Sequence, residues 1–178
     1  AAHVLADKLF GYEQICAEPF RVWRNGKNLI IVTGIGLVNA SLGFAWAADN
    51  FKFSDALNIG AAGATIVDEN AEPDPSIMGR VCNISKAVCL GLSFDIADGG
   101  ERLVTSSRPV ETRADRIAAG RLAPLVDMEG YAFAQAASIY GKKLSMIKMV
   151  TDFSQECDIF ANNEKMAVRF AEMRDLWI

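Results

Sequence analysis

The feature that most constrains this chain is an apolar run that ends in two acids and turns directly into a helix. It reads Leu125-Val126-Asp127-Met128-Glu129-Gly130-Tyr131-Ala132. Residues two apart in a strand lie on the same side of it, so Asp127 and Glu129 are predicted to face one cleft. A second apolar run, residues 146–150, ends in Thr151 and Asp152. Ligands in open α/β sheets bind beyond the carboxyl ends of strands, so the two runs predict one pocket lined by carboxylates.

Strand-like runs alternate with helical patterns along the chain, which is typical of an α/β protein. We expect a three-layer sandwich with a central mixed twisted sheet, formed by a single domain over residues 1–178. The pattern predicts an N-terminal helix with Leu5, Leu9 and Tyr12 on one face, a β-hairpin at residues 20–33 around Asn25-Gly26, a helix at residues 37–50, a strand at residues 55–59 that ends in a turn of small residues at 60–64, a polar helix at residues 112–121 and a final helix at about residues 159–175.

Composition excludes several classes of function. A net charge of −4, with acids and bases interspersed, argues against a nucleic-acid interface, which needs a clustered basic face. No apolar run reaches the ~20 residues that span a bilayer. The four cysteines and the one histidine, His3, lack the spacing of a metal site or a disulfide framework. No secretory signal peptide is visible, so the expected location is the cytoplasm.

Four short motifs occur in an order that resembles the nucleoside phosphorylase/nucleosidase superfamily. They are TGIGLVNA at residues 33–40, NIGAAG at 58–63, VDMEG at 126–130 and KMVTD at 148–152. Within the superfamily the chain looks most similar to the methylthioadenosine/S-adenosylhomocysteine nucleosidases and the futalosine hydrolases. The resemblance spans nearly the whole chain. It implies a small-molecule nucleoside as partner, a homodimer, and neither a metal nor an organic cofactor.

The resemblance assigns roles to the residues around the acids. Glu129 would accept hydrogen bonds from the 2′- and 3′-hydroxyls of ribose, because a carboxylate accepts from two donors at once, and Met128 would pack beneath the sugar. Asp152 would protonate or hydrogen-bond N7 of the purine, with Thr151 holding it in place. An apolar pocket wall would favour the protonated acid.

Further residues would line the same pocket. The small residues at 60–63 would bring backbone close to the sugar, as glycine permits, and Ile35 and Gly36 would form the floor. Phe153 could stack on a purine or pack in the core. Asp127 stands where the family has a glutamate, and Lys148 where it has an arginine. The expected substrate-binding residues are Glu129, Met128, Asp127, Thr151, Ile35, Gly36, Ala61, Ala62, Gly63 and Phe153.

The implied reaction is cleavage of the N-glycosidic bond of an adenosine-like nucleoside, of the 5′-methylthioadenosine, S-adenosylhomocysteine or futalosine type. Superfamily phosphorylases hold phosphate with an arginine and a serine where this chain has Asn58 and Ala61, so water is the expected nucleophile. The hydrolases activate water with a glutamate whose position here is Ala6. Asp7 is the candidate replacement, and with Asp152 it completes the expected catalytic residues. A phosphate-dependent phosphorylase and a non-catalytic nucleoside-binding relative remain alternatives.

Overall fold

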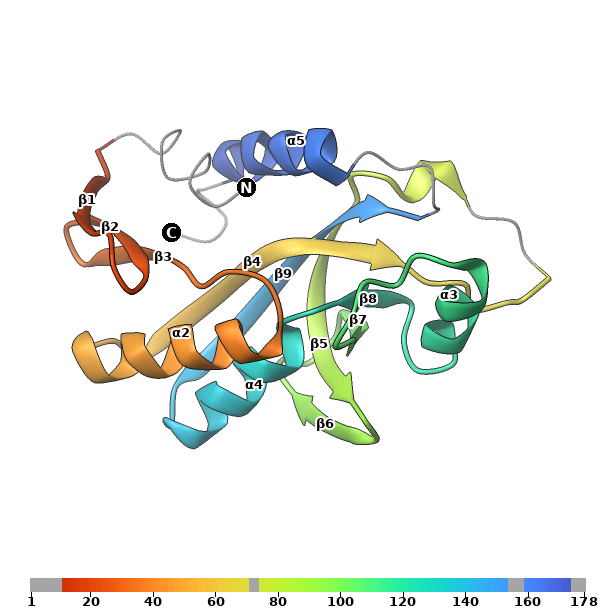
Figure 1. Ribbon diagram of the computed structural model, residues 1–178, viewed down its shortest axis with the longest axis horizontal. Helices are drawn as coiled ribbons and strands as arrows, with labels where there is room; N and C mark the ends of the chain where they lie inside the picture. Colours follow the sequence, from red (N-terminus) through yellow and green to blue (C-terminus); the bar gives the residue numbers. More distant parts are fainter. Residues whose placement is uncertain (1–10, 71–73, 154–158, 174–178) are drawn as a thin grey trace.

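A mixed β-sheet with helices on both faces forms the body of the molecule (Figure 1). The computed structural model describes residues 11–70, 74–153 and 159–173. The strands of this sheet are β4 (Asp55–Ala64), β5 (Val81–Cys89), β6 (Leu92–Asp95), β7 (Glu101–Thr105), β8 (Leu125–Asp127) and β9 (Lys143–Asp152). They lie in the order β6-β5-β7-β8-β4-β9, and β5 also pairs with β9, so the sheet curls back on itself.

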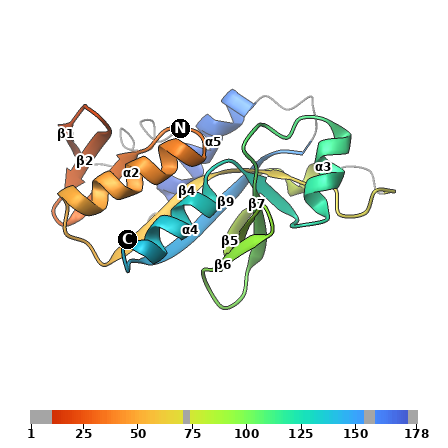
Figure 2. The same cartoon turned by 60° about the horizontal axis from the view of Figure 1, so that its bottom comes forward.

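The helices form a layer on each side of the sheet. They are α2 (Leu37–Asn50), α3 (Arg113–Gly120), α4 (Gly130–Ile139) and α5 (Ile159–Glu172). α2 and α4 run side by side on one face, and α5 lies on the opposite face (Figures 1 and 2). The main core, with Phe44, Leu103 and Met146, includes residues of α2, α4 and the sheet. On the opposite face, Phe170 of α5 packs with Met149 of β9. The expected fold class, a three-layer α/β sandwich with a central mixed sheet, is confirmed.

A small antiparallel sheet precedes α2. It contains β1 (Glu13–Cys16), β2 (Arg21–Asn25) and β3 (Asn28–Val32), and a short 3₁₀ helix, η1 (Pro75–Ile77), follows β4. The predicted hairpin is confirmed, because β2 and β3 pair up to Asn25 and Asn28 across a two-residue turn in which Gly26 has a φ of 56°. Of the predicted N-terminal helix, Leu5 and Leu9 lie outside the described residues.

The turn predicted at residues 60–64 is wrong. β4 continues through this stretch, parallel to β9 as far as the Gly63–Asp152 pair and antiparallel to β8 at its end. The small residues permit close approach by neighbouring side chains. A Cβ on Gly60 would lie 3.1 Å from Lys148 Nζ, and one on Gly63 would lie 2.7 Å from Asp152 Oδ2. Glycine inside a strand often marks such an approach rather than a turn.

The two strands that lead to the acids run in opposite directions beside β4. β8 runs antiparallel to β4, whereas β9 runs parallel to it. The acids nevertheless converge on β4, because Gly63 pairs with Val126 of β8 on one side and with Asp152 of β9 on the other. Neighbouring strands lie about 4.8 Å apart, which places the backbones of β8 and β9 about 10 Å apart across β4.

Candidate active site

One cavity of about 1410 Å³ is lined by both Glu129 and Asp152. It extends along β4 and β9 and exceeds the roughly 300–1,000 Å³ of ordinary small-molecule sites. The candidate site is the part around residues 60–63 of β4, where the two acids approach from β8 and β9. Most of the other expected site residues line this cavity too: Ile35, Ala61, Ala62, Gly63, Asp127, Met128 and Thr151.

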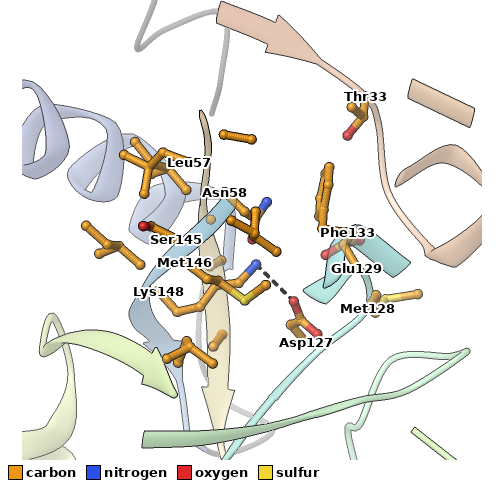
Figure 3. A pocket seen from close by; sticks show the side chains of 18 of the residues that line it. Thr33, Leu57, Asn58, Asp127, Met128, Glu129, Phe133, Ser145, Met146 and Lys148 are labelled. Atoms are coloured by element: carbon orange, nitrogen blue, oxygen red, sulfur yellow. Dashed lines mark ion pairs between the residues drawn. The ribbon is translucent and has the colours of Figure 1, made fainter. Parts of the chain in front are cut away.

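Glu129 directly precedes α4, and its carboxylate is tied to the loop before α2. Its Oε1 accepts a hydrogen bond of 2.6 Å from the backbone N–H of Gly36. The N–H of Gly36 thus anchors Glu129. Gly36 has a φ of 94°, a conformation that favours glycine. Burial raises the pKa of Glu129 above its ordinary value, while the Gly36 hydrogen bond and the charge of Lys148 act in the opposite direction. Figure 3 shows Glu129 close to Met128 and Phe133.

Asp127 forms a buried ion pair with Lys148. Its Oδ2 accepts from Lys148 Nζ at 2.9 Å and from the N–H of Gly130 at 2.8 Å, and its Oδ1 accepts from Thr105 Oγ1 at 2.7 Å. The side chains of Asp127 and Lys148 are 1% and 2% exposed (Figure 3). Asp127 and Lys148, two positions at which the chain differs from the family pattern, therefore contact each other. Three acceptor positions of the Asp127 carboxylate are thus occupied by protein groups, and Asp127 also lines the cavity, so its direct contact with a substrate stays a prediction.

Asp152 lies against a buried arginine. Arg116 Nη2 donates to Asp152 Oδ2 at 2.6 Å, and Arg116 Nη1 donates to the carbonyl of Ala64 at 2.6 Å. The hydroxyl of Thr151 lies 3.2 Å from Asp152 Oδ1 and donates to it. The side chains of Arg116 and Asp152 are 4% and 17% exposed. An apolar wall beside Asp152 was expected, and that expectation is wrong, because α3 places a cation there.

Two residues of the site, Arg116 and Thr105, were missed by sequence reasoning, and so was the ion pair of a third, Lys148, with Asp127. Arg116 belongs to the predicted polar helix at 112–121, where arginine is ordinarily solvated, and no periodicity marks it as buried. Thr105 ends β7, and no motif in the sequence marks it as a site residue. Lys148 did carry a usable signal, because a lysine inside an apolar run is almost never fully buried without a partner.

Two expected residues fall outside this constellation. Asp7 lies outside the described residues. Phe153 is partly buried and packs against the main core, and it is not among the residues that line the cavity. Within residues 11–70, 74–153 and 159–173, no group of three or more His, Cys, Asp or Glu side chains could hold a metal ion. None of the helices in that part of the chain is both long and apolar enough to cross a membrane.

The fold is shared with solved structures of 5′-methylthioadenosine/S-adenosylhomocysteine nucleosidases. No protein-family model and no curated protein matches the chain.

The similar structures include several 5′-methylthioadenosine/S-adenosylhomocysteine nucleosidases. The enzyme from Colwellia psychrerythraea, in complex with adenine, is 19% identical with a TM-score of 0.75, over 94% of this chain and 85% of that one. The Neisseria meningitidis enzyme, bound to methylthio-immucillin-A, is 17% identical with a TM-score of 0.75, over 97% and 91%. A Helicobacter pylori mutant with 5′-methylthioadenosine in its active site is 13% identical with a TM-score of 0.79, over 98% and 91%.

Proposed function

We propose that this chain is a purine-nucleoside N-ribohydrolase acting on an adenosine-like nucleoside of the 5′-methylthioadenosine, S-adenosylhomocysteine or futalosine type. The observation that carries the proposal is that Glu129 and Asp152 line one cavity from opposite sides of β4. A fold whose solved examples hold adenine or 5′-methylthioadenosine supports it. A nucleoside lying across residues 60–63 would place its ribose at Glu129 and its purine at Asp152.

The proposed reaction breaks the bond between C1′ and N9 and forms a bond from C1′ to a water oxygen. The water gives a proton to a base, for which Asp7 is the proposed residue. The purine takes a proton from solvent at N7 as the bond breaks, and the proton later lost from Asp7 to solvent balances it. Positive charge develops on the sugar, and the Glu129 carboxylate beneath it stabilises that charge. Asp152 hydrogen-bonds the departing purine.

The cations near β4 support water rather than phosphate as the nucleophile. Asn58 and Ala61 carry no charge, and Asn58 Oδ1 is buried without a hydrogen-bond partner among the described residues. Lys148, the first side chain that a Cβ on Gly60 would meet, is already neutralised by Asp127 at 2.9 Å. A phosphate ion at this position would have to compete with that carboxylate for the lysine.

The test is a product screen by chromatography with 5′-methylthioadenosine, S-adenosylhomocysteine, futalosine, adenosine and inosine, each with and without phosphate. In the absence of phosphate we expect the free base, adenine or hypoxanthine according to the substrate, together with the free ribose sugar. Strict phosphate dependence would instead identify a phosphorylase. Tight nucleoside binding with no base release would identify a non-catalytic relative.

A Glu129→Gln variant is expected to weaken ribonucleoside binding by roughly tenfold or more, because the amide lacks the charge that strengthens hydrogen bonds to the hydroxyls. The 2′-deoxyribonucleoside, which lacks one of those hydroxyls, should lose less. Calorimetric titration of both ligands measures the difference. Equal losses for the two sugars would remove the assigned contact.

Gly63→Ala is expected to lower base release by about 10²-fold, because the new methyl group would lie 2.7 Å from Asp152 Oδ2 and would displace that carboxylate. Gly60→Ala is the matched comparison, since its methyl group meets Lys148 Nζ at 3.1 Å and should cost less. Steady-state rates of both variants, with circular dichroism to check folding, give the answer. A larger loss in Gly60→Ala would contradict the placement of Asp152.

A homodimer is part of the proposal. Ile35, which precedes α2 and lines the cavity, is 73% exposed, and Val38 and Leu42 of α2 are 71% and 57% exposed. Covering these side chains with a second copy of the chain would remove apolar surface from water. Sedimentation equilibrium measures the mass, and a monomer at all concentrations would contradict this part of the proposal.

A further inference from the structure

The arginine beneath Asp152 is the strongest unassigned feature of the cavity. An arginine cannot be deprotonated in a protein, and a buried charge is costly unless it is paired. Arg116 is 3% exposed, and among the described residues its carboxylate partner is Asp152. The pair joins α3 to the end of β9, residues 36 apart in the chain. The position of Asp152 is therefore set by Arg116 as well as by its own strand.

Several contacts fix the geometry of this pair. The carbonyl of Ala64 holds Arg116 Nη1 at 2.6 Å, and Gly63 leaves space for Asp152 Oδ2 where a Cβ would lie at 2.7 Å. Thr151 donates to the other carboxylate oxygen at 3.2 Å. Arg116 Nε is buried and has no hydrogen-bond partner among the described residues, so the guanidinium is held through its two Nη atoms alone.

We propose that Arg116 is a positioning residue for purine recognition. It fixes Asp152 as a hydrogen-bond acceptor, and the site thereby favours the departing purine, which presents N–H groups at positions 6 and 7. A carboxylate beside a guanidinium has only acceptors to offer, whereas a neutral carboxylic acid could donate to a bare ring nitrogen. The inference rests on the proposed function in placing the purine at Asp152.

Two isomers of one base provide the probe. 9-Deazaadenine carries a fixed N–H at ring position 7, and 7-deazaadenine carries a C–H there, while both keep the 6-amino group. Their size is the same, and they differ in whether the five-membered ring carries its N–H at position 7 or at position 9. Tighter binding of 9-deazaadenine therefore reports an acceptor that faces position 7 rather than position 9. A polar site that loses one hydrogen bond discriminates strongly between such analogues.

Isothermal titration calorimetry of the purified chain with each isomer tests the proposal. Wild type is expected to bind 9-deazaadenine at least about tenfold more tightly than 7-deazaadenine. Arg116→Gln should reduce that preference to about threefold or less. Arg116→Lys, which keeps the positive charge, should restore most of it. Arg80→Gln, which breaks the exposed Arg80–Glu101 pair, is the matched control and should leave the preference unchanged.

Equal binding of the two isomers by wild type overturns the proposal, and this measurement requires no variant. An undiminished preference for 9-deazaadenine in a folded Arg116→Gln variant also overturns it. Loss of that preference in the Arg116→Lys variant overturns it as well. Preferential binding of 9-deazaadenine by a chain that releases no base from any nucleoside would leave the role of Arg116 standing and defeat the proposed hydrolysis. Base release by a chain that binds the two isomers equally would support the proposed hydrolysis and defeat the role of Arg116.

Discussion

Asp152→Asn is expected to reduce release of free base by about 10³-fold, while nucleoside affinity stays within about tenfold of wild type. The amide has nearly the same shape and can still accept a hydrogen bond through its oxygen. It cannot carry the charge that balances Arg116, or that strengthens the hydrogen bond from the N–H of the departing purine. The loss should therefore appear in kcat much more than in KM.

The same variant removes the counter-charge of a buried guanidinium, so its stability must be measured together with its rate. We expect the free energy of unfolding to fall by about 1–3 kcal/mol, since the asparagine oxygen still accepts from Arg116. Asp95→Asn is the control, because it removes a carboxylate from the exposed Lys86–Asp95 pair and should change neither quantity by much. Wild-type turnover in a folded Asp152→Asn would exclude Asp152 from the mechanism.

The layers of the fold follow from local sequence, but its curled sheet does not. Alternating strands and helical stripes identify the hairpin at Asn25-Gly26 and the helices that pack on the sheet, because those signals depend on neighbouring residues. The direction of β8 relative to β4 depends on long-range pairing between Val126 and Gly63, which no local pattern contains. Small residues at 60–64 read as a turn for the same reason, since the side chains that approach them come from β9.

The site was predictable where a residue acts alone and unpredictable where it acts through a partner. Glu129 follows a buried strand and faces the cavity, as its position indicates. Asp127 has the same local setting, yet its charge is taken up by Lys148 and its other oxygen by Thr105. Arg116 illustrates the limit most clearly, because an arginine on a polar helix is buried only through the packing of α3 over the end of β4.

Lys148→Met is expected to lower the free energy of unfolding by about 3–5 kcal/mol, the usual cost of leaving one member of a buried ion pair unpaired. Both side chains are at most 2% exposed, so water cannot screen the Asp127 charge that remains. Lys86→Met, in the exposed pair with Asp95, should cost less than about 1 kcal/mol. Urea unfolding of both variants measures the contrast.

The double variant Asp127→Asn/Lys148→Met measures the interaction energy between the two charges apart from their contacts with other residues. Once both charges are gone, the loss should be smaller than the sum of the two single losses by at least about 2 kcal/mol. Strict additivity would mean that the charges do not interact as their 2.9 Å separation requires.

The same lysine should also control the pH at which Glu129 binds ribose. The Lys148 charge lowers the pKa of Glu129 and the Asp127 charge raises it, in addition to the larger effect of burial. Ribonucleoside affinity in wild type should fall as the pH drops through this raised pKa, because the protonated acid binds the hydroxyls less strongly.

The variants should move the pH at which this fall in affinity, the acid limb, occurs. In Lys148→Met the remaining Asp127 charge is unopposed, so the acid limb should move to higher pH. Removing Asp127 as well should bring the limb back towards the wild-type position, and in Glu129→Gln the limb should be absent. A limb that stays in place in Lys148→Met would show that the buried pair supports only the fold and does not tune the carboxylate above it.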